Sequence, residues 1–379
     1  MTQDKTLDSS QGNTRRQLLQ ASAAGLGAGL LAGLPVLAAA APTFAVPDEA
    51  RPQTRVWMGW PASAGIWGSS LLRKVQDDIA RLARTIAKYE PVTLLASGTT
   101  NANAARTRIG ATNYPVTILS NIPVDDCWLR DTGPVFRVNG AGGLDCIGLN
   151  FNGWGNQQTW RRDGYVAERI AAQLGLQITH ADIVGEGGGV IYDGDGTLIA
   201  NESCWVNGNR NPGVTRAEIE AELLHLYGAS KMIWCPGIKG QDITDDHIDA
   251  TAQFVGPGRL VIHNPPANDT GIWAQDARKV RSILSAATDA RGRRFNITLL
   301  NQPTRGRLSG PDALLTYINY LVVNQAVITV NFGDTITDSD TFAKLSALYP
   351  GRTVEMINMD SLYTGGGGIH CVTQQQPVV

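Results

Sequence analysis

The chain carries a thiol beside a glycine run, a combination that suits nucleophilic catalysis. Cys371 comes shortly after the four glycines at 365–368. Glycines allow the backbone to turn sharply and let another group approach closely, so Cys371 is a candidate nucleophile. His370 is adjacent, but neighbouring residues on a strand point to opposite faces, which makes it a poor candidate for the base.

One histidine and three acidic residues are the candidate partners of this thiol. The spacing of His247 and Asp249 would put both on one face of a strand, as base and orienting acid, as base and substrate-binding acid, or as half a metal site. Asp131 precedes a Gly-Pro turn signal and Glu186 precedes three glycines, so a turn alone explains either residue. Since no second His or Cys stands at ligand spacing, we expect neither metal nor cofactor.

Several carboxylates beside a thiol point to a cationic substrate. Carboxylates raise the pKa of a nearby thiol, which opposes catalysis unless the substrate brings positive charge. A guanidinium is planar, always cationic and matched to carboxylates by its paired N–H donors. The residue types therefore predict a cysteine enzyme that modifies guanidines. The non-enzymatic alternative is a guanidine-binding protein, which would need the carboxylates and aromatic residues but neither the thiol nor the histidine.

Strand-like and helix-like segments alternate along the chain, and no linker divides them. Apolar residues at a 3.6-residue period predict a helix over 71–86, and a capping box formed by Thr215 and Glu218 opens a second over 215–227. The other expected helices are 162–174 and 341–348, and the expected strands are 55–60, 91–96, 177–184, 259–263, 296–300 and 326–332. This alternation predicts a single α/β domain over residues 46–379.

The first 45 residues have a different pattern. Arg15 and Arg16 precede an apolar run of small residues at 21–37, and alanines at 38–41 form a plausible cleavage region. The pattern resembles a twin-arginine export signal, so we expect residues 1–45 to be removed and the protein to be periplasmic or secreted. The run is short and rich in Gly and Ala, so no stable membrane span is expected after processing.

The counts of charged residues and cysteines bear on the binding partners and on disulfide pairing. Lys and Arg number 32 against 34 Asp and Glu, and no basic run occurs, so no nucleic-acid partner is expected. The odd count of five cysteines leaves at least one thiol free in a monomer. Pairing among Cys127, Cys146, Cys204 and Cys235 stays open, as does a homo-oligomer. Asp125, at the start of the segment 125–134, is expected to be a solvated turn residue.

Eight segments resemble the agmatine deiminases, which belong with the bacterial-type peptidylarginine deiminases in the guanidino-group-modifying (pentein) superfamily. They occur in family order from about residue 47 to the end, at 56–61, 126–134, 151–155, 186–188, 209–212, 247–249, 331–334 and 365–377. Gly368 stands where the family usually has Asn, and Asp246 where it usually has Gly. The opening Arg-Met-Pro-Ala-Glu segment is reduced to Ala45–Glu49. Because of these departures, the resemblance does not determine which group the substrate carries at the end away from its guanidine.

The resemblance implies a five-bladed α/β-propeller of ββαβ units and assigns the site residues. It makes Cys371 the nucleophile, His247 the general acid and base, Asp131 and Asp249 the guanidinium clamp, Glu186 a contact of the histidine or substrate, and Trp128 and Trp154 substrate-binding residues. The implied reaction is hydrolysis of a small guanidine, agmatine, to N-carbamoylputrescine and ammonia through a covalent cysteine thioether. The alternative is conversion of arginine to citrulline in an arginine-containing peptide.

Overall fold

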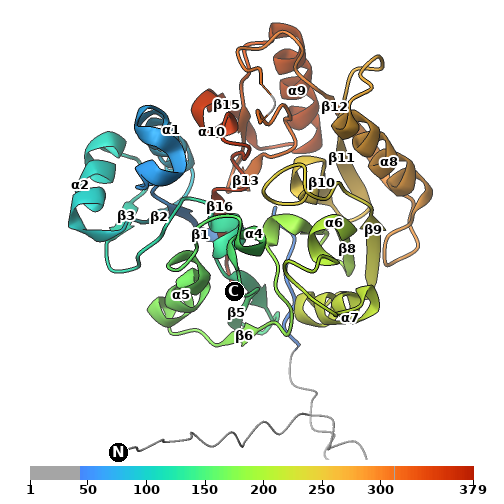
Figure 1. Cartoon of the computed structure of the whole chain (residues 1–379), viewed down its shortest axis with the longest axis horizontal. Helices are drawn as coiled ribbons and strands as arrows, with labels where there is room; N and C mark the ends of the chain where they lie inside the picture. Colours follow the sequence, from blue (N-terminus) through green and yellow to red (C-terminus); the bar gives the residue numbers. More distant parts are fainter. Residues whose placement is uncertain (1–42, 311) are drawn as a thin grey trace, which may run out of the picture. The chain divides into compact units, whose positions relative to one another are not determined.

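Five small sheets make up residues 43–310 and 312–379, the part of the chain that the computed structural model describes (Figure 1). The predicted export signal lies outside the described residues except for positions 43–45. Four of the sheets repeat one arrangement: two antiparallel strands, then a helix, then a third strand parallel to the second; the first sheet adds a fourth strand. The prediction of an α/β fold is confirmed, and four of its five sheets have the predicted ββαβ form.

The strands are β1 (Gln53–Gly59), β2 (Val92–Leu95), β3 (Val116–Leu119), β4 (Val135–Val138), β5 (Leu144–Gly148), β6 (Ile178–His180), β7 (Val190–Tyr192), β8 (Thr197–Asn201), β9 (Lys231–Cys235), β10 (Ala252–Gly256), β11 (Arg259–Asn264), β12 (Asn296–Asn301), β13 (Leu321–Val323), β14 (Ala326–Val330), β15 (Thr353–Ile357) and β16 (Thr373–Pro377). The longer helices are α1 (Ala64–Ile86), α2 (Gly98–Ile109), α5 (Val166–Leu174), α7 (Arg216–Tyr227), α8 (Ile272–Ala286) and α9 (Thr335–Leu348). Short helical turns are α3 (Leu129–Thr132), α4 (Gly153–Asn156), α6 (Glu202–Trp205), α10 (Asp360–Tyr363), η2 (Asp163–Tyr165), η3 (Gly187–Gly189) and η4 (Ile248–Ala250).

The first sheet joins the two ends of the folded chain. Its order is β16-β1-β2-β3, so the last strand pairs antiparallel with the first, with Val56 opposite Gln375. β1 and β2 pair in parallel, and α1 connects them along the chain. The remaining four sheets are each built from consecutive strands. The first unit is therefore completed only by the residues at the C-terminal end.

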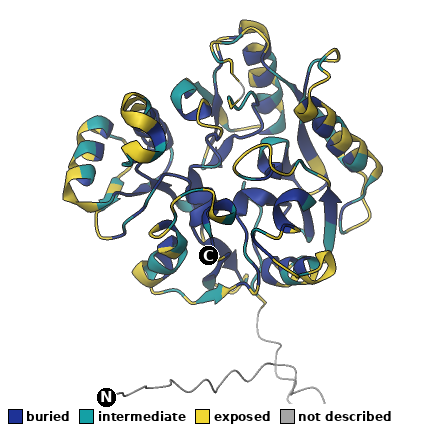
Figure 2. Ribbon diagram, viewed as in Figure 1, coloured by how far each residue is buried: buried dark blue, intermediate teal, exposed yellow. Residues whose placement is uncertain are grey.

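The long helices pack one face inward and expose the other (Figure 2). In α1 most apolar residues of the predicted period are buried, namely Val75, Ile79, Leu82 and Ile86, because the 3.6-residue repeat places them along one stripe; Leu71 and Leu72 are half-buried. The capping box at Thr215 is present at the start of α7. α9 begins six residues earlier than predicted, because the Asp334 side chain accepts hydrogen bonds from the Ile336 and Thr337 amides.

All five cysteines are free thiols in the structure, so no pair among the four candidates forms a disulfide. Among the described residues, no helix is both long and apolar enough to cross a membrane.

Candidate active site

The predicted site residues come from four different connections between strands and meet in one place. Cys371 lies between α10 and β16, Asp131 in α3, Glu186 just before η3, and His247 and Asp249 at η4. The expectation that the last two lie on a strand is wrong: His247 caps a single 3₁₀ turn that contains Asp249. A turn of this kind lets both side chains converge without the period-2 geometry of a strand.

Gly188 forms the floor on which three of these side chains converge. A Cβ atom placed there would lie 2.6 Å from His247 Nδ1, 2.9 Å from Asp131 Oδ1 and 3.2 Å from Asp249 Oδ2. Real Cβ atoms do not approach other atoms at the first two of these distances, so only glycine fits. The glycine run after Glu186 therefore serves close packing at the site and is more than a turn signal.

Asp131 is buried and held by two neutral N–H donors. Its Oδ2 accepts a hydrogen bond from Trp154 Nε1 at 3.0 Å, and its Oδ1 accepts one from the Gly188 amide at 3.0 Å. Burial raises the pKa of Asp131, although His247 acts in the opposite direction. Trp154, with a left-handed φ of 53°, thus orients the carboxylate through its indole nitrogen. Trp154 therefore contacts Asp131 directly and fixes the orientation of its carboxylate.

His247 lies between two carboxylates. Its Nε2 is 3.3 Å from Glu186 Oε2, and its Nδ1 is 3.8 Å from Asp131 Oδ1. Burial disfavours the charged ring, but Asp131 and Glu186 outweigh it and raise the pKa of His247 to about 9. The imidazole is therefore protonated at neutral pH, ready to donate a proton.

Glu186 is itself anchored by a buried ion pair. Arg210 Nε lies 2.8 and 3.0 Å from its two carboxylate oxygens, and Arg210 Nη1 lies 2.8 Å from Asp245. Burial opposes ionisation of Glu186, but His247 and Arg210 keep its pKa below the ordinary value. The carboxylate is fixed as an anion that stabilises the imidazolium.

Cys371 stands beside Asp249 and Asn319. Its Sγ is 3.8 Å from Asp249 Oδ2 and 3.4 Å from Asn319 Oδ1. Burial and the charges of Asp249 and Asp131 raise the pKa of the Cys371 thiol well above its usual range. Asp249 Oδ1 is buried and has no hydrogen-bond partner, which is costly unless a donor arrives. The site is thus poised for a cation with N–H groups.

Two stacked tryptophans pack against the glycine run that precedes Cys371. The rings of Trp128 and Trp67 lie 5.7 Å apart at 29°, and both indole nitrogens donate to Asp126 at 2.8 and 2.7 Å. A Cβ at Gly367 would come within 2.2 Å of the Trp128 ring. The glycines let the nucleophile loop lie flat on this aromatic pair.

Sequence reasoning missed Asn319, Arg210, Arg130 and Glu49, and it set His370 aside. Arg130 and Arg210 belong to segments that resemble the family, so their positions carried a signal. Asn319 lies in no such segment, and only its contacts identify it. It also explains the departure at Gly368, because a Cβ there would come within 2.4 Å of Asn319 Oδ1.

The expectation that Asp125 is a solvated turn residue is wrong. Its Oδ2 accepts a hydrogen bond from the Arg162 amide at 2.6 Å, and its own amide donates to Asp163 at 2.7 Å.

At Asp246, where the family usually has glycine, the backbone adopts a φ of 70°. This lies in the left-handed region that glycine adopts freely. Among the described residues, no group of three or more His, Cys, Asp or Glu could hold a metal ion.

Five small sheets, four of them of ββαβ form, with a thiol, a histidine and carboxylates gathered between them define the pentein class of fold. Residues 45–377 match the sequence pattern of the Porphyromonas-type peptidyl-arginine deiminases. The agmatine deiminase of Pseudomonas fluorescens strain SBW25 is 34% identical over 371 residues, covering 88% of this chain and 95% of that protein. That of Pseudomonas aeruginosa strain LESB58 is 33% identical over 358 residues, with the same coverage.

Solved structures agree with these relatives. An agmatine deiminase of Enterococcus faecalis matches this structure with a TM-score of 0.82 at 26% identity, covering 88% of this chain and 96% of that one. The chain belongs to the Porphyromonas-type peptidyl-arginine deiminase family, in which the agmatine deiminases named above are its relatives.

We predict that Asp131→Asn and Asp249→Asn each reduce kcat/KM for a guanidine by about two to four powers of ten. The lost charge-assisted hydrogen bond is worth roughly 1.5–3 kcal/mol, and the new N–H donor adds a penalty of roughly 1–3 kcal/mol. At Asp131 that donor would also face the Trp154 or Gly188 N–H groups.

Asp182→Asn is the control for this pair, because Asp182 is exposed. It should change kcat/KM by less than about threefold, since surface substitutions are usually worth less than about 0.5 kcal/mol. Folding of all three variants is checked by circular dichroism. Equal behaviour of the three would mean that the buried pair is structural.

Proposed function

We propose that the chain hydrolyses the guanidine group of agmatine to N-carbamoylputrescine and ammonia. The observation that carries this proposal is the Oδ1 atom of Asp249, which has no hydrogen-bond partner. Asp249 is only 1% exposed and lies beside the Cys371 thiol. A guanidinium supplies the N–H donor that this oxygen lacks and brings a positive charge next to Asp131 and Asp249. Relatives at 33–34% identity named as agmatine deiminases support agmatine as the substrate.

Binding prepares the nucleophile. The guanidinium donates to Asp249 Oδ1 and lies against Asp131, which together hold it planar with its carbon facing Cys371. Its positive charge offsets the two carboxylates that raise the thiol pKa, so the thiol releases its proton to solvent once substrate is bound, and His247 stays protonated. The thiolate then attacks the guanidine carbon and forms a tetrahedral adduct.

His247 handles the protons of both half-reactions. Its imidazolium protonates one amino group of the adduct, the C–N bond breaks, and ammonia leaves an amidino thioether on Cys371. The neutral imidazole then removes a proton from water, whose oxygen attacks the same carbon. Collapse of that adduct breaks the C–S bond, releases the ureido product and regenerates the thiol and imidazolium. Glu186 stabilises the charged ring throughout.

We predict that Cys371→Ala abolishes release of ammonia and of the ureido product. Agmatine should still bind within about tenfold of the parent affinity, because the carboxylates supply most of the ground-state interaction. Turnover is measured with agmatine, free arginine and a peptide with internal arginine, and binding by calorimetry. The proposal expects agmatine to have the highest kcat/KM.

Cys146→Ala is the matched control, since Cys146 is a buried thiol in β5 away from the site. It should retain turnover. Residual turnover of Cys371→Ala above about a few per cent would exclude this thiol as the nucleophile. Preference for the peptide would replace agmatine by the peptidylarginine alternative, and binding without turnover of any of the three compounds would favour the guanidine-binding protein.

The protonation states predict how rate depends on pH. Below pH 9 the free site holds both the thiol and the imidazolium protonated, because the pKa of His247 is about 9 and that of Cys371 is raised further. The attacking state has one proton fewer. We therefore expect kcat/KM for agmatine to rise about tenfold per pH unit and to level off near pH 9. A plateau already reached below about pH 7 would contradict these protonation states.

We further propose that the N-terminal segment directs export, so that the protein acts in the periplasm or outside the cell. Support comes from the arginine pair 15–16 and the apolar run 21–37. Ala45 exchanges backbone hydrogen bonds of 2.9 Å with Val138, and the Val46 amide donates to Tyr227 O. These contacts favour cleavage upstream of residue 45, within the alanines 38–41.

Replacing Arg15 and Arg16 together by Lys should retain the protein in the cytoplasm of a bacterial host, because twin-arginine signals are read through that pair. The measurement is deiminase activity in periplasmic and cytoplasmic fractions. The replacement of Lys5 by Arg is the control and should not alter the distribution. Equal export of both variants would refute a twin-arginine signal.

A further inference from the structure

We propose that Glu49, on the segment that precedes β1, is a positioning residue for catalysis: it holds the ring of His370, which in turn orients Asp249 toward the guanidinium. This inference rests on the proposed function. Glu49 and His370 have no role predicted from the sequence, and they lie near opposite ends of the folded chain. They meet because β16 pairs with β1.

The chain of contacts is direct. His370 Nδ1 lies 2.7 Å from Asp249 Oδ2, and His370 Nε2 lies 3.1 Å from each carboxylate oxygen of Glu49. His370 and Asp249 are each 1% exposed, so water does not compete for the bond between them, whereas the Glu49 side chain is 14% exposed. The backbone amide of His370 donates to Asn319 Oδ1 at 2.9 Å, which fixes the ring's starting point.

Both nitrogens of the His370 ring face carboxylate oxygens. A neutral imidazole has one N–H, so one nitrogen lone pair would point at an anion; an imidazolium donates to both. The charged groups around the ring are Glu49 from the N-terminal segment, Asp249 from η4 and Arg130 from α3. Burial and Arg130 disfavour the imidazolium, but Glu49 and Asp249 outweigh them and raise the pKa of His370.

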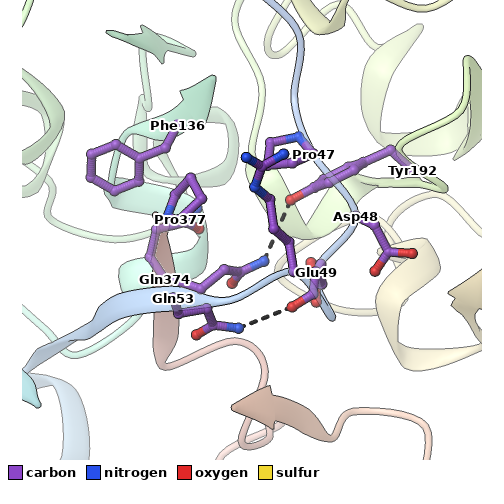
Figure 3. Close-up of a pocket in the computed structure, with 10 residues that line it drawn as sticks. Pro47, Asp48, Glu49, Gln53, Phe136, Tyr192, Gln374 and Pro377 are labelled. Carbon is purple, nitrogen blue, oxygen red and sulfur yellow. Dashed lines mark hydrogen bonds between the residues drawn. The ribbon is translucent and has the colours of Figure 1, made fainter. Parts of the chain in front are cut away.

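Glu49 is itself held firmly. Arg130 Nη1 lies 3.2 Å from Glu49 Oε1, and Arg130 Nη2 donates to Gln375 at 2.7 Å. The Glu49 carbonyl accepts a hydrogen bond from Gln53 Nε2 (Figure 3). Burial opposes its charge, yet His370 and Arg130 lower the pKa of Glu49 to about 2. The anion is thus present across the working pH range.

The consequence lies at Asp249. With Oδ2 taken by the His370 imidazolium, the carboxylate cannot rotate, and its Oδ1 stays unpartnered for substrate. The positive ring also limits how far Asp249 opposes ionisation of the Cys371 thiol, 3.8 Å away. Removing the charge of Glu49 would weaken the imidazolium, free Asp249 to turn, and misplace the guanidinium without touching it.

The test compares Glu49→Gln with Asp48→Asn. Asp48 is the adjacent acid and lines the same hollow as Glu49 (Figure 3). Its Oδ1 accepts a hydrogen bond from the Ala50 amide, so it has a local role of its own. Both changes remove one negative charge and keep the side chain's shape. Only the first removes a contact of His370.

Two properties are measured on the protein after removal of the export signal: the titration of His370 and the steady-state kinetics. Histidine ring NMR follows the titration of His370, whose signal is assigned by its loss in His370→Gln. In Glu49→Gln this titration should move down by about one pH unit or more, the usual effect of losing an opposite charge in contact. Steady-state kinetics with agmatine should show kcat/KM lower by about tenfold or more. Asp48→Asn should change neither.

Glu49→Asp is the control that separates loss of the negative charge from disruption of the local structure. It keeps the charge, so the His370 titration should stay near that of the parent and kcat/KM should recover in part. A titration unchanged in Glu49→Gln overturns the clamp on the ring, and a moved titration with unchanged kcat/KM overturns its role in positioning. Equal losses in Asp48→Asn would assign the effect to the segment as a whole. If the parent does not turn over agmatine, the proposed function fails, while the NMR comparison still tests the clamp.

Discussion

The site depends on burying two carboxylates, Asp131 and Asp249, beside a thiol without satisfying all of their hydrogen-bond acceptors. Asp131 is held by neutral N–H donors, and Asp249 keeps one oxygen without a partner. A buried anion of this kind is expensive, and it also suppresses the thiolate. Both penalties are relieved by the same event, the arrival of a guanidinium. The incompletely satisfied carboxylates therefore favour binding of a cation with N–H donors.

The surrounding structure keeps this arrangement from collapsing. Without anchors, the acids would rotate toward solvent or share protons. Glu186 is fixed by the Arg210 guanidinium and Asp249 by the His370 ring, while Asp131 is held by the Trp154 and Gly188 N–H groups. Gly188 leaves the space in which His247, Asp131 and Asp249 approach one another. The five small sheets supply rigid strand ends from which these short connections project.

Much of this could be predicted from the sequence, and the exceptions have physical causes. Periodicity found α1, and the capping box found the start of α7, because both signals are local. The predicted set of site residues does come together, but the geometry at His247 and Asp249 was mistaken for a strand, since spacing alone does not separate a strand from a 3₁₀ turn. The environment of Asp125 depended on Asp163, a contact that no local pattern reveals.

Residues that act through others were the hardest to find. Asn319 holds the backbone of Cys371 and His370 from a loop with no motif, and it accounts for the glycine at 368. Glu49 lies in a segment that matches the family poorly, and its side-chain partners Arg130 and His370 are 81 and 321 residues away along the chain. Spacing arguments describe neighbours along the chain, whereas these roles come from neighbours in space.

The pairing of β16 with β1 bears on when reactivity first appears during synthesis. Gln53 lies opposite Pro377 in that pair, two residues from the end of the chain, and Cys371 sits just before β16. Such distant contacts form late. A nascent or truncated chain lacking its last dozen residues would have neither the thiol nor the strand that closes the first sheet. Cys371 is therefore held at the site only once β16 has paired with β1.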